Sequence, residues 1–253
     1  MEMIQLVRKF GRVDLKLIWR DRFLLMMFAL VVVLALALRY AMPGLDAHLA
    51  ETGVLPSENI SLRLADVFPM IVAYMAIFQG GMLVGVIMGF MLLDEKDYNT
   101  IKAMLVTPVT LNQYVLYRVG LPAVLGIVVI LAMTLLINQA LIPLWQLTLI
   151  AAAASITAPC SSLFLGIFAE NKVQGFAVSK FISLAGYIIV FGWFVSEPFQ
   201  WLFGLFPPFL VAKAYWMALE GHALWWLVLL IGTFLQFVML AWFVRRFNRE
   251  AYR

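Results

Sequence analysis

The chain has 253 residues, of which 64% are hydrophobic and only 13% are charged, and its formal net charge is +4. Soluble domains are roughly 45–50% apolar and about 25% charged, so this composition excludes a soluble enzyme and a disordered protein. The single cysteine also excludes a secreted scaffold held together by internal disulfides.

Residues 1–22 are predicted to form a basic amphipathic helix. Its positive charges recur at three- to four-residue steps, opposite an apolar face, and they are Arg8, Lys9, Arg12, Lys16 and Arg20. That period is helical. A basic amphipathic helix beside a membrane span tends to lie in the headgroup layer, which we favour here over a solvated cytosolic helix.

Six segments are apolar and long enough to cross a bilayer, for which an α-helix needs about 20 residues. They are residues 23–41, 67–93, 115–137, 144–169, 176–195 and 224–244. Pro159 is expected to kink the fourth of them, because proline removes a helical hydrogen bond. The sequence therefore predicts an all-α integral membrane protein with six transmembrane helices.

The segment before the sixth span, residues 196–223, is rich in aromatic residues instead of charges. Aromatic side chains favour the membrane interface. We expect two short re-entrant or interfacial helices that form a hairpin broken at Pro207 and Pro208. Irregular backbone at membrane depth needs protein or water beside it, so this hairpin is expected to cap a cavity.

The distribution of lysine and arginine predicts the orientation. With both termini in the cytosol, fifteen of these residues lie inside, including the basic tail 245–253, and three lie outside, namely Arg39, Arg63 and Lys213. Cytosolic loops carry the excess of positive charge in membrane proteins. Because the charge follows the membrane topology in this way, we expect no nucleic-acid partner.

Common signatures of catalysis are missing from the sequence. It contains no Gly-x4-Gly-Lys-Ser/Thr phosphate loop, no His-Glu-x-x-His and no Gly-x-Ser-x-Gly. His48, His222 and Cys160 lie far apart in sequence, which leaves few ligands for a metal. We therefore expect no catalytic residue, no metal and no cofactor in this chain.

The segment between the second and third spans, residues 95–108, is predicted to be a short cytosolic helix. Ile101, Met104 and Leu105 recur at helical spacing and form a small apolar stripe. Pro108 disfavours a helical conformation for Thr107, so the helix should end there. The stripe suits docking into the groove of a partner, but packing under its own bundle explains it equally well.

A resemblance decides between these two readings. The segment carries an acidic residue, four intervening positions, a threonine, an apolar helix and a Thr-Pro pair, in the residues Glu95, Thr100, Met104, Leu105, Thr107, Pro108 and Val109. This pattern resembles the coupling helix of the type-2 ABC exporter permeases. The chain departs from the family at Asn99, where glycine is usual, and at Lys102, where an acidic residue often follows.

The resemblance implies several partners. Two copies of a separate ABC ATPase subunit, which hold ATP and Mg, would receive the coupling helix, and a second permease, identical or paralogous, would complete the transporter. Glu95 and Thr100 would orient the helix, Met104 and Leu105 would pack into the ATPase cleft, and Thr107 and Pro108 would end the helix. Ile101 shares the apolar stripe.

The same resemblance implies a function. The chain is most similar to small permeases of the fluoroquinolone exporter type, which implies outward transport of an amphipathic or apolar substrate across a prokaryotic inner membrane, in contact with membrane lipid. Export of lipid, polysaccharide or haem is the first alternative. A membrane enzyme acting on lipids and a secondary transporter are the others, but neither a clustered acid–base set nor a repeat is visible.

Two features inside the second span are candidates for helix packing and substrate contact. Gly81, Gly85 and Gly89 recur every four residues, a spacing that lets helix backbones approach closely in lipid; their partner is another span or the second permease. Gln79 is the best candidate for a residue that lines the substrate path, although an interhelical hydrogen bond is the more common role of such a residue.

Overall fold

The computed structural model describes residues 3–51, 64–98 and 111–251, and among these residues there are helices and turns but no β-strand. Six helices are long and apolar enough to cross a membrane: Leu24–His48, Phe68–Asp97, Gln113–Ile137, Leu144–Phe168, Lys172–Trp193 and Trp225–Arg249. The predicted all-α fold with six crossings is confirmed, and the chain is a multi-pass membrane protein.

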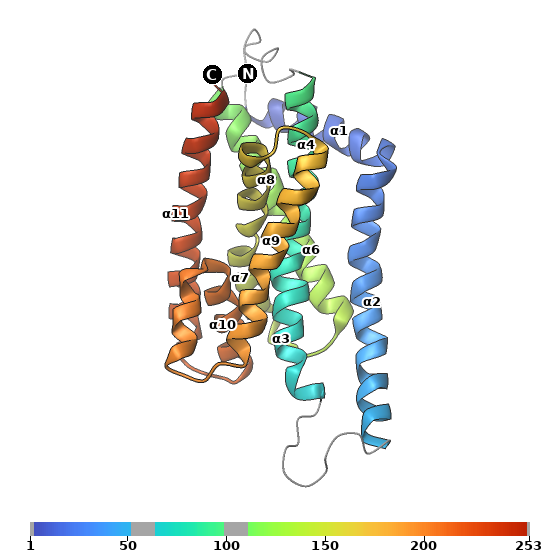
Figure 1. Ribbon diagram of the computed structural model, residues 1–253, viewed down its shortest axis with the longest axis vertical. Coiled ribbons are helices and arrows are strands. Elements are labelled where there is room, and N and C mark those ends of the chain that lie inside the picture. The colour runs from blue at the N-terminus through green and yellow to red at the C-terminus, as the bar shows by residue number, and fades with distance from the viewer. Residues whose placement is uncertain (1–2, 52–63, 99–110, 252–253) are drawn as a thin grey trace.

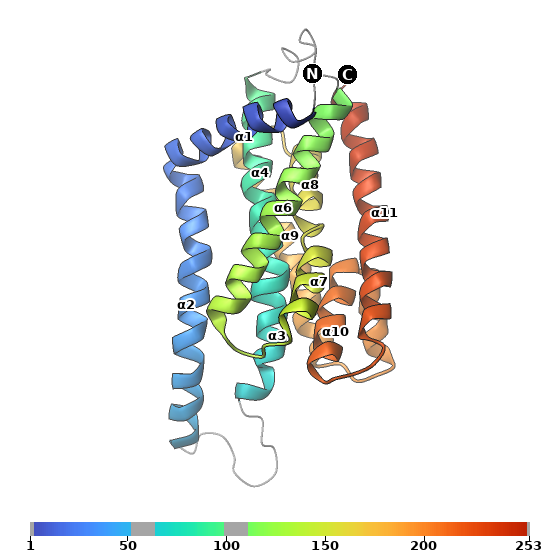
Figure 2. The ribbon, with the colours of Figure 1, turned by 180° about the vertical axis from the view of Figure 1, so that it is seen from behind.

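The first two helices form an L at one edge of the molecule. Helix α1 (Met3–Arg20) lies across the end of the bundle, and α2 (Arg22–Glu51) then runs along its side (Figure 2). Asp21 at the corner accepts a hydrogen bond from the Leu24 backbone N–H (3.3 Å), which satisfies one of the free donors at the start of α2. On α1 the side chains of Val13 and Trp19 are exposed.

The second crossing forms the centre of the bundle. It is built from η1 (Leu64–Val67), α3 (Phe68–Val72), the π-helical turn η2 (Ala73–Phe78) and α4 (Gln79–Asp97). Most of its residues between Met70 and Leu93 are buried. Helix α6 (Leu111–Ile137) packs against it and also contacts α2. Figure 1 shows α4 surrounded by α6, α8 and α9.

The fourth crossing is broken a few residues before Pro159. Helix α7 (Leu144–Ala154) ends, and α8 (Thr157–Phe168) begins after a two-residue turn. Pro159 has no N–H for the carbonyl of Ser155, and that carbonyl instead accepts from the Ala158 N–H (3.0 Å). The break therefore occurs one helical turn before the proline.

Glycines of α4 allow α8 to approach closely. A Cβ on Gly85 would overlap the Ala158 carbonyl oxygen, and one on Gly89 would lie 3.0 Å from the Leu165 Cβ. At Gly81 the nearest atom would be the Ala154 carbonyl oxygen, at 3.3 Å. The partner of the glycine face in this structure is thus the fourth crossing of the same chain, with the end of α7 against Gly81 and α8 against Gly85 and Gly89.

The remaining helices form the last two crossings and the hairpin between them. Helix α9 (Lys172–Trp193) leads into the 3-10 helix η3 (Phe199–Leu205), and α10 (Pro207–Leu219) returns into the bundle before α11 (Trp225–Ala251) crosses it. The two hairpin helices meet at Phe206, directly before the predicted Pro207–Pro208 break. Helix α10 is buried, and its Tyr215 hydroxyl donates to the Ala140 carbonyl (2.5 Å).

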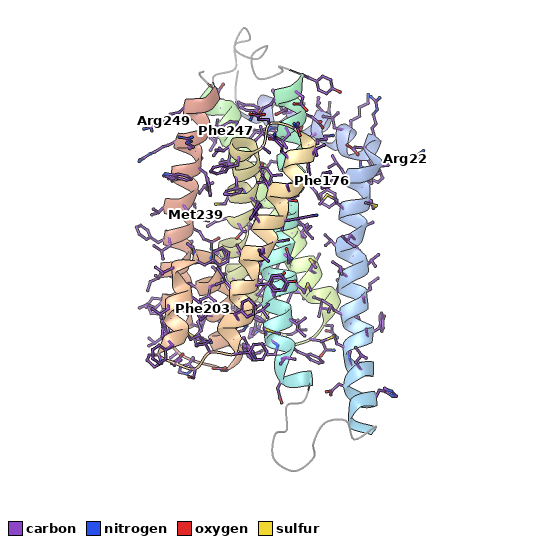
Figure 3. The ribbon with its side chains drawn as sticks, viewed as in Figure 1. Arg22, Phe176, Phe203, Met239, Phe247 and Arg249 are labelled. Atoms are coloured by element: carbon purple, nitrogen blue, oxygen red, sulfur yellow. The ribbon has the colours of Figure 1, made fainter. Side chains whose placement is uncertain are left out.

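One end of the molecule collects exposed basic side chains, and we call it the basic end. Helix α1, the end of α4, the start of α6 and the end of α11 all lie there (Figure 1). Arg22 and Arg249 are at this end in Figure 3, and the other exposed basic residues here are Arg12, Lys16, Arg20, Arg245 and Arg246.

Candidate functional site: a charged cluster beside the 99–110 segment

Three consecutive charged residues in the last turn of α4 each bind a different neighbouring element. Asp94 pairs with Lys172 at the start of α9 (2.9 Å), Glu95 pairs with Arg118 of α6, and Lys96 donates to backbone carbonyls at the end of α8. Successive helical residues point about 100° apart, so one turn of α4 reaches three helices. This turn contains the first residues of the predicted coupling helix, 95–108, because α4 continues to Asp97.

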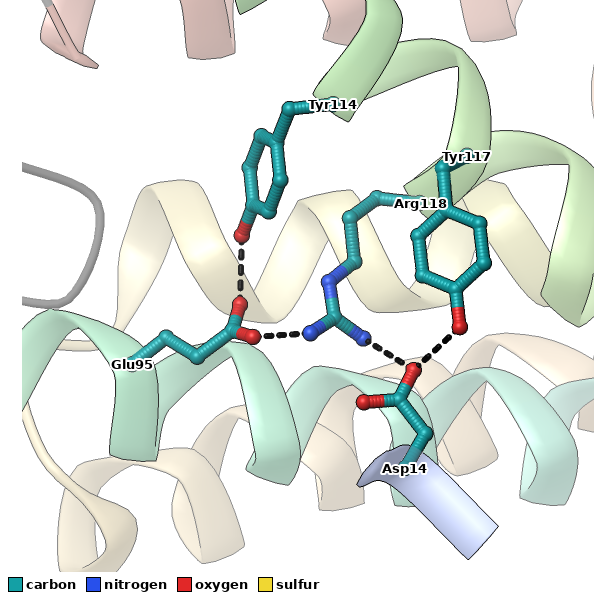
Figure 4. A network of polar contacts seen from close by, with 5 residues as sticks. All are labelled: Asp14, Glu95, Tyr114, Tyr117 and Arg118. Atoms are coloured by element: carbon teal, nitrogen blue, oxygen red, sulfur yellow. Dashed lines mark hydrogen bonds and ion pairs between the residues drawn. The ribbon is translucent and has the colours of Figure 1, made fainter. Parts of the chain in front are cut away.

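Arg118 is the centre of a buried cluster that we call the Arg118 cluster, made of Asp14, Glu95, Tyr114, Tyr117 and Arg118 (Figure 4). Its guanidinium binds Glu95 through Nη2 and Asp14 of α1 through Nη1 (3.1 Å). The Arg118 side chain is 3% exposed, that of Asp14 4% and that of Glu95 15%. One cation thus joins α1, α4 and α6.

Two tyrosines complete the cluster. The Tyr114 hydroxyl donates to Glu95 Oε2 (2.5 Å) and the Tyr117 hydroxyl donates to Asp14 Oδ2 (2.7 Å). Both rings also lie 5.6 Å from the Arg118 guanidinium carbon, within the range of cation–π attraction. Because Tyr114, Tyr117 and Arg118 are three and four residues apart, a single face of α6 supplies all of these groups.

Lysines extend the contacts to the other helices. Lys172 of α9 lies between Asp94 and Asp21, at 2.9 and 3.8 Å, and therefore ties α9 to α4 and to the α1–α2 corner. Lys96 Nζ binds the carbonyl oxygens of Gly166 (2.7 Å) and Ala169 (3.3 Å). A cation at the C-terminal end of a helix satisfies free carbonyls and the helix dipole, so Lys96 holds α8 to α4.

The burial of the Arg118 cluster determines what it does. Buried ion pairs contribute little net stability compared with apolar residues, but removing one partner is costly because it leaves an unpaired charge. The cluster therefore holds α1, α4 and α6 against one another, and the loss of any one partner would leave a buried charge unpaired.

Most of the predicted coupling residues lie outside the described part of the chain. These are Thr100, Ile101, Met104, Leu105, Thr107 and Pro108. Glu95 is described, and its carboxylate faces Arg118 and Tyr114 within the bundle. Glu95 is therefore bound to α6, the helix that follows residues 99–110 in the chain.

The sequence did not predict four members of this cluster as site residues. They are Asp14, Tyr114, Tyr117 and Arg118. The available signals were an acidic residue within the otherwise basic face of the amphipathic helix and an arginine placed inside the apolar start of the third span. Ionisable residues at such depths usually have a partner and a function.

Gln79 lies on the central crossing at the junction of η2 and α4, and it is the first residue of α4, whereas Glu95 of the cluster lies in the last turn of that helix. Its Nε2 donates to the Tyr74 hydroxyl (3.1 Å), and the Tyr74 ring lies 5.3 Å from that of Tyr187 on α9. Gln79 Oε1 is buried and has no partner among the described residues. A π-helical turn such as η2 is frequent at functional sites.

The described part of the chain contains no group of three or more His, Cys, Asp or Glu side chains that could hold a metal ion. The acidic residues of the cluster are already paired with Arg118 and the tyrosines. Among the described residues, the cluster therefore holds helices in place and offers no ligand set for a resident ion.

A smaller polar cluster holds the hairpin at the opposite end. Lys213 of α10 donates to Glu197 Oε1 (2.6 Å) and to Gln200 Oε1 (2.5 Å), and Gln200 Nε2 donates to the Gly192 carbonyl (2.8 Å). The hydrogen bond and the charge of Lys213 lower the pKa of the Glu197 carboxyl. These contacts connect η3 to α9 and α10.

This pKa shift predicts a pH-dependent stability. A carboxyl whose pKa is lowered by folding stabilises the fold above its usual pKa, and this contribution is lost as the pH falls through the lowered value. We expect Glu197→Gln to lower the melting temperature by only about 2 °C at pH 7, since the group is exposed. The difference in melting temperature between variant and wild type should disappear in acid, where the wild-type carboxyl is protonated. Glu220→Gln, at another exposed glutamate, is the control, and a gap that persists in acid would contradict the assignment.

The model of the Rv2686c-like family, described as "Fluoroquinolones export permease protein Rv2686c-like", matches residues 14–244. The chain belongs to this family. The match begins at Asp14 and includes every member of the Arg118 cluster. It confirms the resemblance to small export permeases.

Two curated relatives extend the comparison. The fluoroquinolones export permease proteins MT2760 and Rv2686c, from the CDC 1551 and H37Rv strains of Mycobacterium tuberculosis, are each 27% identical over 245 residues. The alignment covers 95% of this chain and 93% of each relative. No solved structure matches the chain.

Proposed function

We propose that this chain is the membrane-spanning subunit of an ATP-driven exporter that moves amphipathic, drug-like molecules, with fluoroquinolones as the first candidates. The family and both curated relatives carry fluoroquinolone export in their names. The six apolar crossings would form the transmembrane domain of such a transporter. Hydrolysis of ATP, with its Mg, belongs to a separate ATPase subunit, since the sequence has no phosphate loop.

The observation that carries the ATPase proposal is the anchoring on both sides of the 99–110 segment. Glu95 before it and Arg118 after it are paired with each other, and Arg118 also holds Asp14. A push on the segment is therefore delivered to α4, α6 and α1 together, and through Asp94 and Lys172 to α9. The apolar stripe of Ile101, Met104 and Leu105 is then the surface that fits the ATPase cleft, with Thr100 orienting it and Thr107 and Pro108 ending it.

The proposed assembly contains two permeases and two ATPase subunits. Each chain has a single coupling segment, so an ATPase pair needs a second permease, which is identical or paralogous. The basic end then faces the cytosol, because loops rich in lysine and arginine stay inside. Both termini lie at that end, in the inner membrane of a prokaryote.

The substrate path is proposed to pass Gln79. Its Oε1, which has no partner in the described ranges, and the nearby Tyr74 and Tyr187 provide uncharged hydrogen-bonding groups next to aromatic rings. A substrate with both apolar and polar parts suits this combination, whereas a strongly charged one would lack a partner at this depth.

Leu105→Asp tests the ATPase contact. The charge in the apolar stripe is expected to abolish co-purification of the ATPase subunit and energy-dependent fluoroquinolone efflux, because an unpaired carboxylate is costly in an apolar groove. Leu205→Asp is the matched control, since Leu205 is 91% exposed on η3 at the opposite end. Normal ATPase binding by the Leu105 variant would refute the docking role, and absence of efflux by the wild-type complex would refute the substrate class.

A further inference from the structure

Four exposed cations gather where α1 meets α2, and we call them the basic corner: Arg12, Lys16, Arg20 and Arg22. The first three follow one another at four-residue steps and therefore lie on one face of α1. Arg22 begins α2, and Figure 3 labels it at this edge of the basic end. In the described ranges, none of the four forms an ion pair with a carboxylate. The chain itself therefore leaves these charges without a counterion.

The acidic residues near the corner lie on the other side of α1. Asp14 is the only acidic residue of α1, it lies about 200° around the helix from Arg12, and it is buried. A groove of about 420 Å³ between α1 and α4 is lined by four carboxylates, those of Asp14, Asp21, Asp94 and Glu95. The preference of cytosolic loops for lysine and arginine accounts for the number of cations at this end. It does not account for their separation from the acidic residues onto one outward face.

The basic corner lies next to the start of a membrane crossing. The apolar crossing Leu24–His48 begins three residues after Asp21, and α1 runs across the end of the bundle (Figure 2). Trp19 is seven residues from Arg12, on the same face of α1, and it is 73% exposed. Tryptophan is enriched at the depth of the lipid headgroups. A face that combines tryptophan with unpaired cations at this position fits a lipid surface better than bulk water.

We propose that the basic corner binds anionic phospholipid headgroups in the leaflet at the basic end, with Trp19 seated among them. Four-residue steps along a helix are about 6 Å long, so the three cations of α1 form a row that can reach neighbouring headgroups. Basic residues on an amphipathic helix are attracted to anionic lipid, whereas a zwitterionic headgroup carries no net charge for them. The inference requires only the membrane crossings and does not depend on which substrate is transported.

Lipid bound at the corner would secure α1 from its outer face. The inner face of the same helix is already held by Asp14, which pairs with Arg118 (3.1 Å). A ligand that binds only the packed arrangement stabilises that arrangement. Anionic lipid should therefore keep α1 against the bundle, next to the Arg118 cluster.

An acidic surface on a protein partner is the other ligand that a row of cations could take. The position of Trp19 favours lipid, because a soluble protein would have to displace headgroups to reach a tryptophan at that depth. The two ligands also differ in what their loss would remove, namely a bound phospholipid or a bound subunit. The experiment below separates them.

The first test compares two matched double variants of the full-length chain. Arg12→Gln with Lys16→Gln removes two exposed cations four residues apart on α1, and Arg245→Gln with Arg249→Gln does the same on α11 at the same end. Native mass spectrometry with added dioleoyl-phosphatidylglycerol gives the Kd. We expect the α1 variant to raise it roughly 25-fold, since each basic residue near an anionic surface contributes about fivefold. The α11 variant should change it less than about threefold, and the affinity for dioleoyl-phosphatidylcholine should stay the same in both.

A third variant separates charge from shape. Arg12→Lys with Lys16→Arg exchanges the two side chains and keeps both charges, so it should bind phosphatidylglycerol within about twofold of the wild type. Added salt should weaken binding to the wild type, because salt screens exposed charges. Loss of affinity in the exchanged variant, or binding that is insensitive to salt, would overturn the proposal.

Hydrogen exchange tests the effect on α1. In nanodiscs that contain phosphatidylglycerol, we expect the amides of α1 to exchange about fivefold more slowly than in phosphatidylcholine alone, as for a ligand at several times its Kd. The variant with Arg12→Gln and Lys16→Gln should show no such difference. Equal exchange of the wild type in both lipids would refute the stabilising role.

Two further outcomes would also refute the proposal. The first is wild-type affinity for phosphatidylglycerol in the variant with Arg12→Gln and Lys16→Gln. The second is a variant that keeps its lipid affinity but loses a co-purified protein subunit, which would make the basic corner a protein interface. Neither outcome depends on drug transport, so the proposed function is tested separately.

Discussion

Replacing Arg118 by methionine is expected to cause one of the two largest losses of stability and function in this protein. Methionine keeps the length of the side chain but leaves Asp14 and Glu95 without a cation at positions that are 4% and 15% exposed. Breaking a buried ion pair on one side typically costs about 3–5 kcal/mol. For a chain of this size, that corresponds to a fall in melting temperature of roughly 10 °C.

The single cysteine offers a direct measurement. Cys160 is buried, so a thiol-reactive fluorogenic dye reports its exposure when the protein unfolds. Arg118→Lys is expected to give an intermediate melting temperature, since an ammonium cannot reproduce the two-sided guanidinium contact. Arg245→Met is the control, because Arg245 is an exposed arginine near the end of α11 and its loss removes a positive charge from the same end.

A triple variant separates unpaired charge from lost shape. Combining Asp14→Asn and Glu95→Gln with Arg118→Met removes all three charges, and we expect it to recover much of the stability lost by Arg118→Met alone. Drug efflux should stay low in the triple variant, because the fixed register of α1, α4 and α6 is lost with the charges. Full efflux there would show that the cluster does not transmit force.

Gly85→Ala is expected to have the second large effect. The added Cβ would meet the backbone carbonyl oxygen of Ala158, and a backbone atom cannot move aside as the end of a flexible side chain can. Overpacking costs about 1–3 kcal/mol in ordinary cores, and we expect the upper end of that range here because α4 and α8 form the most extensive contact among the described helices. The measurement is the same thiol-exposure melting curve, together with the yield of folded protein.

Other glycines provide a graded control. The cost should fall from Gly85 to Gly89 and then to Gly81, following the distance from the added Cβ to its nearest neighbour. Gly120→Ala, on α6, has no atom within 4 Å of the new Cβ and is expected to gain about 0.5–1 kcal/mol from better helix propensity. Equal effects at Gly85 and Gly120 would refute the close α4–α8 contact as the cause.

Several parts of the fold follow from local properties of the sequence. A crossing needs only a long apolar run, so all six could be predicted without knowing what each one contacts. The basic face of residues 1–22 and the hairpin break at Pro207 are also local signals, because charge spacing and proline act within a few residues. The fourth crossing shows the limit of such reasoning: the sequence predicts a kink at Pro159, and the structure has a break at Ser155 and Ile156, where the Ser155 carbonyl accepts from the Ala158 N–H instead.

The pairings between helices could not be predicted in the same way. Asp14 and Arg118 meet across 104 positions of sequence, and Thr157 meets Gln236 across 79. In a soluble protein, an apolar stripe indicates which side of a helix faces the core. The central helices here are apolar on every side, because lipid and protein interior are equally apolar surroundings, so the pattern contains little information about helix rotation.

The amino-acid sequence alone was sufficient to determine that this chain crosses a membrane six times, which end carries the positive charge and which short segment resembles a coupling helix. Each of these depends on residues close together in the chain. Only the tertiary structure decided that Arg118 joins three helices and that Gly85 of α4 lies against the Ala158 carbonyl of α8. Such sites depend on how the helices are rotated and packed, and close packing against neighbouring helices sets that rotation.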